Sequence, residues 1–302
     1  MKVVIALGGN ALLTRGQPMT VENQRLNVRR AAIAIVRVVA AGHEVTVTHG
    51  NGPQVGLMAL QDMAHDEALA SPIDVLGAET EGMIGYLIVQ ELGNVLPQTK
   101  DVVALLTQIE VDADDPAFQK PTKPIGPVYG EKEAAALAAR HSWVMVQDEQ
   151  HFRRAVPSPR PKRILEIGVI RLLIRSGVTV VCAGGGGIPV VRRKDGGHTG
   201  IEAVIDKDHA SGLLAREIGA DTLLLLTDVD GVYLDWGTAQ QRRLATVTPT
   251  ELASHRFASG SMGPKVSAAI DFSSVGGRIT GIGRLEDALD ILEQRAGTVI
   301  KV

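Results

Sequence analysis

Short apolar runs alternate with helical patterns along the chain. The runs are rich in Val, Ile and Leu, as is typical of strands buried on both faces of a sheet. They lie at residues 3–7, 45–48, 102–106, 178–183 and 222–226.

Two helices are predicted next to these strands. Residues 21–41 carry Leu26, Ile33, Val36 and Val39 at helical spacing and stop at Gly42, which predicts a βαβ unit.

A second helix is predicted from Asp206 to the residue before Gly219, just ahead of the strand at 222–226. Its apolar positions are Ala210, Leu213, Leu214 and Ile218. Alternating strands and helices predict a mainly parallel sheet covered on both faces, with ligands at the carboxyl ends of the strands.

Residues 112–163 interrupt this alternation with seven prolines and frequent charges. A disordered loop and a small inserted subdomain are both compatible with that composition. The run Trp143 to Val146 offers core candidates, which favours the folded subdomain.

Composition excludes several classes of protein. The apolar fraction is 45%, the charged fraction 22% and the formal charge −3, so the chain lacks the clustered positive charge and the aromatics that nucleic-acid binding uses. No apolar run is long enough to span a bilayer, and no signal peptide is apparent. With Cys182 the single cysteine, we expect a protein of the reducing cytoplasm, without a nucleic-acid or membrane partner.

Glycine-rich turns follow three of the predicted strands. They are Gly8-Gly9-Asn10, His49-Gly50-Asn51-Gly52-Pro53 and Gly184-Gly185-Gly186-Gly187. Backbone N–H groups in such turns can close on an anion, whereas a tight reversal of the chain also selects glycine. Anion binding is the favoured interpretation, because the first two turns follow consecutive βα units and four successive glycines are unusual where only a reversal of the chain is needed. His49 is assigned a structural role.

Three lysines accompany the turns. Lys207 lies between Asp206 and Asp208 at a predicted helix start, Lys265 follows a Gly-Pro turn, and Lys123 lies between two prolines. Each alone fits a surface ion pair or a plain loop. Neither the G-x-x-x-x-G-K-[ST] phosphate loop nor the dinucleotide fingerprint is present.

In order, these motifs resemble the carbamate kinase family of the amino-acid kinase superfamily over essentially the whole chain. The resemblance implies a three-layer α/β/α sandwich with a central mainly parallel sheet and a small protruding subdomain at about 112–163. It also implies a single domain over 1–302, whose half at about 1–175 binds the acceptor and whose half at about 176–302 binds the nucleotide. A homodimer is implied as well.

The resemblance also implies roles for individual residues. Lys123, Lys207, Asp208 and Lys265 would be catalytic, with Asp208 organising the lysines. The carbamate and the transferring phosphoryl group would be cradled by Gly8, Gly9, Asn10, Gly50, Asn51, Gly52, Gly184, Gly185 and Gly186. The adenine nucleotide would be bound by Lys207, Thr227, Asp228, Val229, Tyr233, Met262, Gly263 and Lys265.

The implied reaction is reversible phosphoryl transfer between ATP and carbamate, running toward ATP formation from carbamoyl phosphate and ADP. Mg²⁺ would bridge nucleotide oxygens, and no residue is assigned as a metal ligand. Glu81 departs from the glutamine expected in most relatives, and Gly263 from a bulkier residue. Another small carboxylate or phosphonate therefore stays open as the acceptor, as does a non-catalytic metabolite sensor.

Overall fold

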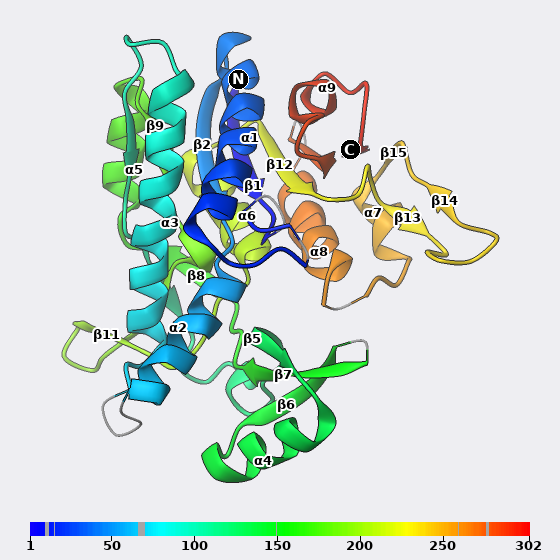
Figure 1. The fold of residues 1–302 in the computed structure, drawn as a ribbon. Coiled ribbons are helices and arrows are strands. Elements are labelled where there is room, and N and C mark those ends of the chain that lie inside the picture. Colours follow the sequence, from blue (N-terminus) through cyan, green and yellow to red (C-terminus); the bar gives the residue numbers. More distant parts are fainter. Residues whose placement is uncertain (10–11, 15, 66–69, 149, 259, 276–277) are drawn as a thin grey trace.

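An eight-stranded sheet runs through the centre of the protein (Figure 1). The computed structural model describes residues 1–9, 12–14, 16–65, 70–148, 150–258, 260–275 and 278–302. Neighbouring strands of the sheet pair in parallel except β16 and β17. Their spatial order is β15 (Thr246–Val247), β17 (Thr298–Ile300), β16 (Ile279–Arg284), β12 (Thr222–Thr227), β1 (Lys2–Leu7), β2 (Glu44–His49), β9 (Thr179–Val181) and β3 (Val102–Ala104).

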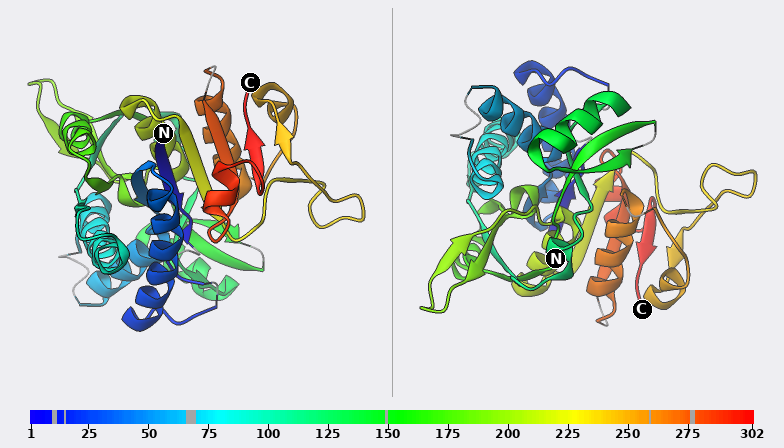
Figure 2. Two further views of the ribbon diagram at one scale, coloured as in Figure 1. Left: turned by 90° about the horizontal axis from the view of Figure 1, so that it is seen from above. Right: turned by 90° about the horizontal axis from the view of Figure 1, so that it is seen from below.

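Helices cover both faces of this sheet, as Figure 2 shows from above and below. Successive strand residues point to opposite faces, so Val3 and Ile5 pack with one set of helices, whereas Val4 and Ala6 pack with the other. The first set is α1 (Val21–Ala40), α3 (Ile73–Val95) and α9 (Ala288–Leu292). The second is α5 (Ile167–Arg175), α6 (Lys207–Ile218) and α8 (Met262–Ser273). The predicted three-layer α/β/α sandwich is confirmed.

Smaller elements complete the main body. A four-stranded sheet has the order β11 (His198–Gly200), β10 (Ile188–Arg192), β4 (Gln108–Val111) and β8 (Pro161–Ile164). The other elements are α2 (Gly52–His65), α7 (Pro249–Ala253), the 3-10 turns η3 (Pro116–Phe118) and η4 (Gly184–Gly186), and the hairpin of β13 (Tyr233–Leu234) and β14 (Arg242–Arg243).

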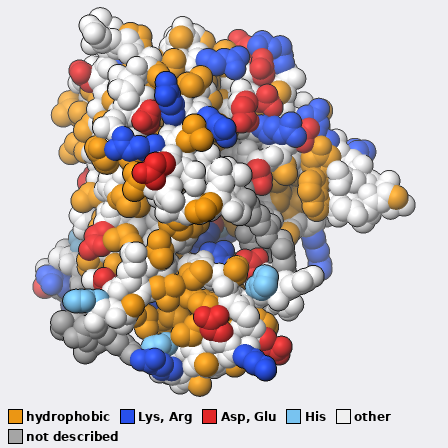
Figure 3. Space-filling view, in the orientation of Figure 1, with side chains coloured by type: hydrophobic (Ala, Val, Ile, Leu, Met, Phe, Trp, Pro, Cys, Tyr) orange, Lys and Arg blue, Asp and Glu red, His pale blue; other side chains and the backbone are white. Residues whose placement is uncertain are grey.

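A small subdomain protrudes below the main body (Figure 1). It consists of a three-stranded antiparallel sheet, in the order β5 (Lys123–Tyr129), β7 (His151–Val156) and β6 (Val144–Asp148), with α4 (Glu131–His141). A small folded subdomain, as expected from the sequence, is therefore present between Lys123 and Val156. Figure 3 shows the surface hollowed between this subdomain and the body, with basic side chains visible inside.

The two predicted helices are found as α1 and α6, but the buried face of α1 differs from the apolar pattern. Leu26 and Ile33 are about half exposed, at 49% and 50%. The face that packs on the sheet instead combines small and β-branched residues, which let the helix approach closely. Those residues are Val28, Ala31, Ala32, Ala34, Ile35 and Val38.

The strand predicted at 102–106 is shorter and more exposed than expected. β3 ends at Ala104 and lies at the edge of the sheet with β9 as its single neighbour. Burial on both faces was the wrong expectation, because an apolar run does not distinguish an edge strand from a central one. Leu106, just beyond the strand, is 54% exposed.

The subdomain packs on α2 by a contact between two backbones. A Cβ atom on Gly56 would lie 1.8 Å from the Cα of Gly126, whose φ of +71° also favours glycine. We expect Gly56→Ala to push α2 and β5 apart and to lower the free energy of unfolding by about 1–3 kcal/mol, measured by chemical denaturation.

Gly93→Ala is the matched control, because Gly93 also lies in a helix, α3, but has open space at the Cβ position. That change should be neutral or stabilising, since alanine is the better helix former. Equal stabilities for the two variants would contradict the close packing at Gly56.

Candidate active site

The glycine turns meet at the carboxyl ends of β1, β2 and β9. A Cβ atom on Gly50 would lie 3.3 Å from the Cδ of Lys207 and 3.7 Å from the backbone nitrogen of Gly9. The Lys207 side chain therefore runs across the second turn, beside the first. Gly8 is fixed by its N–H, which donates to the carbonyl of Leu226 on β12 at 3.0 Å.

The third turn packs tightly on its neighbours. Cβ atoms on Gly184, Gly185 and Gly186 would meet the His49 ring, the Asn51 amide and the Ile205 carbonyl, all at 2.1–2.2 Å. The turn also has positive φ at Gly185 and Gly186. Close packing within the protein thus explains why these positions are glycines. Anion binding by this turn stays a prediction.

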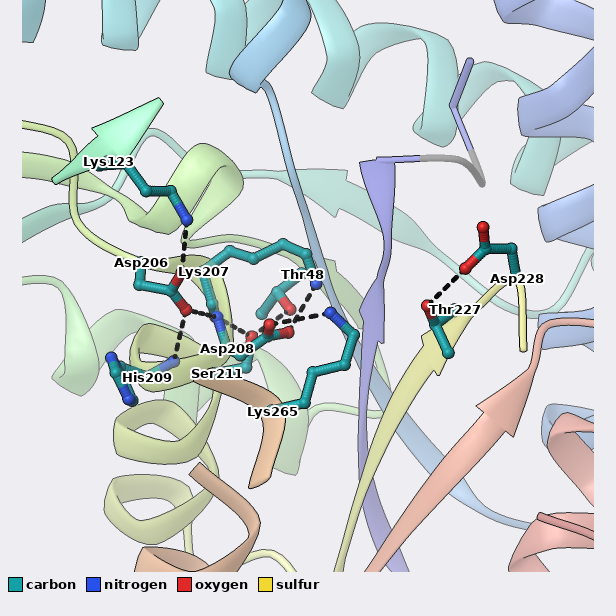
Figure 4. A network of polar contacts seen from close by, with 10 residues as sticks. All are labelled: Thr48, Lys123, Asp206, Lys207, Asp208, His209, Ser211, Thr227, Asp228 and Lys265. Carbon is teal, nitrogen blue, oxygen red and sulfur yellow. Dashed lines mark hydrogen bonds and ion pairs between the residues drawn. The ribbon is translucent and has the colours of Figure 1, made fainter. Parts of the chain in front are cut away.

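Asp208 joins two lysines at the start of α6 (Figure 4). Its Oδ1 lies 2.7 Å from the Nζ of Lys207, and its Oδ2 lies 3.1 Å from the Nζ of Lys265 on α8. Asp208 is 3% exposed and Lys265 is 9% exposed. One buried carboxylate therefore pairs with two ammonium groups, and the catalytic roles of all three residues stay predictions.

The three groups shift one another's pKa values. Burial favours the neutral acid, but Lys207 and Lys265 hold the pKa of Asp208 below its ordinary value. Burial lowers the pKa of Lys207, against the opposing effect of Asp208. Burial also disfavours charge on Lys265, yet Asp208 raises its pKa. Two ammonium groups and one carboxylate leave net positive charge, which suits phosphate oxygens.

Lys123 reaches this cluster from the subdomain. Its Nζ forms an ion pair with Oδ2 of Asp206, while Oδ1 of Asp206 accepts the N–H groups of Asp208 and His209 as the N-cap of α6. Asp206 lies at the helix start predicted from the sequence, whereas its pairing with Lys123 was not predicted. Residues 83 positions apart in sequence carry no local signal of such a pair.

Comparison with known proteins identifies the family of this fold and site. The profile described as the Amino acid kinase family matches residues 1–280. The carbamate kinase of Haemophilus influenzae is 52% identical over 300 residues, which cover 99% of this chain and 96% of that protein. The chain belongs to the amino acid kinase family.

Solved structures agree with this kinase in fold. A carbamate kinase from Giardia lamblia bound to citric acid has a TM-score of 0.93 and 41% sequence identity, covering 99% of this chain and 98% of that one. The same enzyme bound to AMP-PNP has a TM-score of 0.89 and 41% identity over the same shares. The chain is therefore a phosphotransferase, and a non-catalytic sensor is not retained as an alternative.

Two residues of the kinase's second turn are held by the protein itself. The amide nitrogen of Asn51 donates to Oγ1 of Thr80 at 2.8 Å. His49 Nδ1 donates to the Gly50 carbonyl, and burial lowers the pKa of His49 to about 4. A neutral, buried His49 fits a structural role. Gly52 begins α2, and the predicted residue Asn10 lies outside the described residues.

Apart from Lys207 on α6, the residues predicted to bind nucleotide lie between the end of β12 and β13 and in the first turn of α8. Thr227 Oγ1 donates to Oδ1 of Asp228 at 3.0 Å, apart from the lysines in Figure 4. Tyr233 donates to Asp230 at 2.8 Å, and its ring contacts Trp236 edge-on. Val229 and Met262 are half-buried, and the N–H of Gly263 donates to the Ala258 carbonyl at 2.8 Å.

Several residues that support the site were missed at the level of sequence. The hydroxyl of Ser211 on α6 donates to the Lys207 carbonyl at 2.5 Å and lies 2.7 Å from the hydroxyl of Thr48 on β2. Thr107, which was missed, holds the third turn together with Glu81, which the sequence singled out without indicating this contact. A hydroxyl inside an apolar strand or helix face is the one sequence signal that could have pointed to Thr48 and Ser211.

The part of the chain that the structure describes was searched for metal-binding clusters and for membrane-spanning helices. There, no group of three or more His, Cys, Asp or Glu side chains is arranged to hold a metal ion. Among the described helices, none combines the length and the apolar character needed to cross a bilayer.

Cys182 should resist thiol reagents in the folded kinase. It is 1% exposed, and burial raises the pKa of its thiol, so little thiolate forms and reagents cannot reach it. We expect no modification by a disulfide-exchange reagent in the native state and one modified thiol after unfolding in denaturant. Rapid labelling of the native enzyme would contradict this burial.

Proposed function

We propose that this kinase transfers a phosphoryl group between carbamate and an adenine nucleotide. The observation that carries the proposal is the cluster of Lys207, Asp208 and Lys265 at the carboxyl ends of the central strands, with Lys123 reaching in from the subdomain. Full-length relatives named carbamate kinase support carbamate as the acceptor.

The charged residues have distinct proposed roles. Phosphoryl transfer needs in-line positioning and positive charge around the transferring group. Lys123 and Lys207 stabilise charge on that group, and Lys265 binds the nucleotide phosphates. Asp208 keeps Lys207 and Lys265 oriented, which the two ion pairs support.

The glycine turns form the proposed acceptor cradle. Their position beside Lys207 supports this assignment. The set is Gly8, Gly9, Asn10, Gly50, Asn51, Gly52, Gly184, Gly185 and Gly186.

The two halves of the chain are proposed to divide the substrates. The half at about 1–175 binds the acceptor, and the half at about 176–302 binds ATP or ADP. A related kinase bound to AMP-PNP supports an adenine nucleotide as substrate. In this protein, the proposed contacts of the nucleotide are Lys207, Thr227, Asp228, Val229, Tyr233, Met262, Gly263 and Lys265.

Mg²⁺ is proposed to enter with the nucleotide. Asp206 and Asp208 are both engaged by lysines. This arrangement suits an ion held mainly by phosphate oxygens and water, which is how Mg²⁺ often binds in kinases. When bound, Mg²⁺ neutralises phosphate charge.

The proposed direction is ATP formation. A terminal oxygen of the ADP β-phosphate attacks the phosphorus of carbamoyl phosphate, the bond from phosphorus to the carbamate oxygen breaks, and carbamate leaves with the electron pair. Direct transfer needs no covalent enzyme intermediate.

The test is ATP formation from carbamoyl phosphate, ADP and Mg²⁺ by the purified protein and by its Lys207→Ala variant. Rapid ATP formation that is lost in the variant is the expected result. If neither protein forms ATP, carbamate is not the acceptor, and a screen of small carboxylates and phosphonates with ATP then tests the alternative left open by Glu81.

A homodimer is proposed through the exposed edge at β3. Tyr86 and Leu106 are 53% and 54% exposed, and with Val89 they line an open apolar cavity of about 300 Å³. A second copy would cover this surface. Light scattering should give the mass of a dimer, and Leu106→Asp should shift that mass toward the monomer. A monomeric wild-type protein would refute the proposal.

A reducing compartment is proposed as the location of the protein. The single cysteine, Cys182, is buried and free, which supports this location.

A further inference from the structure

The turn after β9 has a backbone that needs external support. Ala183 has φ +51° although it is not glycine, and Gly185, Gly186 and Gly187 have φ +67°, +99° and +80°. Left-handed conformation is unfavourable for alanine, and consecutive glycines are intrinsically flexible. Contacts from outside residues 183–187 must therefore hold this shape.

Thr107 supplies contacts at both ends of the turn. Its Oγ1 accepts the N–H of Ala183 at 2.9 Å while donating to the Leu105 carbonyl at 3.0 Å. Its own carbonyl accepts the N–H of Ile188 at 2.8 Å. Thr107 is fully buried, so water cannot replace these bonds.

Glu81 on α3 completes the support. Its Oε1 accepts the N–H of Gly184 at 2.8 Å, and its Oε2 accepts the N–H of Thr107 at 3.2 Å. The side chain is 3% exposed. One carboxyl group thus joins the turn to the residue that holds both of its ends.

Movement of the turn would reach the lysines. Gly186 packs on the carbonyl of Ile205, next to Asp206, which pairs with Lys123 and caps the helix that carries Lys207. Gly185 packs on Asn51 of the second turn. Because no side chain separates these groups, a displacement of the turn is transmitted directly.

We propose that Glu81 and Thr107 are positioning residues for phosphoryl transfer, holding residues 183–187 so that the proposed acceptor cradle and the lysines keep their relative geometry. The inference rests on the function proposed above. Both residues are argued to act through the turn that they hold.

The two supports should respond differently to pH. The Thr107 hydroxyl does not titrate, whereas burial raises the pKa of Glu81 to about 8 against its bonds from Thr107 and Gly184. The neighbouring titratable groups are His49 on β2, Cys182 after β9, Glu166 before α5, and Lys207 beside His49. Two N–H donors suit the carboxylate best, so the Glu81 support strengthens as the proton leaves.

The experiment compares ATP formation by the wild type, Thr107→Val, Thr107→Ser and Glu81→Gln from pH 7 to pH 9. Valine keeps the shape of threonine but accepts no hydrogen bond, so we expect kcat for carbamoyl phosphate to fall about 10-fold to 100-fold. Serine should restore it, and the KM for ADP should stay unchanged throughout. Glu81→Gln should resemble the wild type near pH 7 and fall behind it toward pH 9.

Thr280→Val is the matched control, because Thr280 is also fully buried and its hydroxyl bonds to Ser273, on α8, at 2.8 Å. It should lower stability without changing kcat. An active wild type with unchanged Thr107→Val kinetics, or a Glu81→Gln rate that keeps a constant ratio to wild type across pH, would overturn the positioning role. An inactive wild type would instead refute the proposed function.

Discussion

Replacing Lys123 by Ala is expected to lower kcat for phosphoryl transfer by about 10²–10³-fold, the usual loss when one preorganised donor to developing charge is removed. Lys123 is the single proposed catalytic group that comes from the subdomain, and it pairs with Asp206 rather than with Asp208. Lys207 and Lys265 therefore keep their own partner, and nucleotide affinity should be unchanged. Steady-state kinetics and calorimetric titration with ADP measure the two quantities.

Lys162→Ala is the control for this change. Lys162 forms an ion pair with Asp112 at 2.6 Å, but its side chain is 53% exposed and lies outside the lysine cluster. Its loss should leave kcat unchanged. If Lys123→Ala turned over like the wild type, Lys123 would have no part in the chemistry, and the ion pair with Asp206 would be structural.

Raising the pH from about 4.5 to about 8 is expected to destabilise the protein through Glu81. The unfolded chain releases this proton near the ordinary value of 4.5, whereas the folded protein keeps it to about 8 because burial raises the pKa of Glu81. The folded state binds the extra proton between these values, so the free energy of unfolding falls with pH by up to about 1.4 kcal/mol per unit. Above pH 8 this contribution stays constant.

Glu81→Gln removes this titration. Urea denaturation at several pH values should show that the variant gains stability relative to the wild type as the pH rises to 8. Parallel curves for the two proteins would mean that Glu81 ionises normally in the fold. At pH 9 we expect Glu81→Gln to have gained stability relative to the wild type while forming ATP more slowly. A lower rate without a loss of stability would show that Glu81 positions the site rather than only stabilising the fold.

The central strands and helices could be predicted because their patterns are local. The apolar run before Gly8 and the helix between Asp206 and Gly219 carry their own signals of burial and capping. The buried face of α1 and the edge position of β3 could not be predicted, because both depend on which other elements pack against them. Leu26 and Ile33 have helical spacing, yet the sheet lies against Ala31 and Ile35.

Motif order singled out the lysines of the candidate site and the partner next to Lys207, whereas the partner of Lys123 could not be predicted. Asp208 lies next to Lys207 in sequence, so that pair was evident, but Asp206 meets Lys123 only through the fold. Glu81 was noticed as an unusual residue, and its bonds to Gly184 and Thr107 needed the packing of α3 on the turn. Pairs between residues far apart in the sequence produce no periodic pattern from which they could be predicted.

The chain enters and leaves the subdomain side by side, because Lys123 on β5 and Val156 on β7 are register partners. The subdomain is thus attached like a module whose two ends already meet. A short link from Thr122 to Pro157 could join the flanking chain without stretching it. Protein engineers could in this way exchange the module between kinases of this family, carrying Lys123 with it and leaving the central sheet untouched.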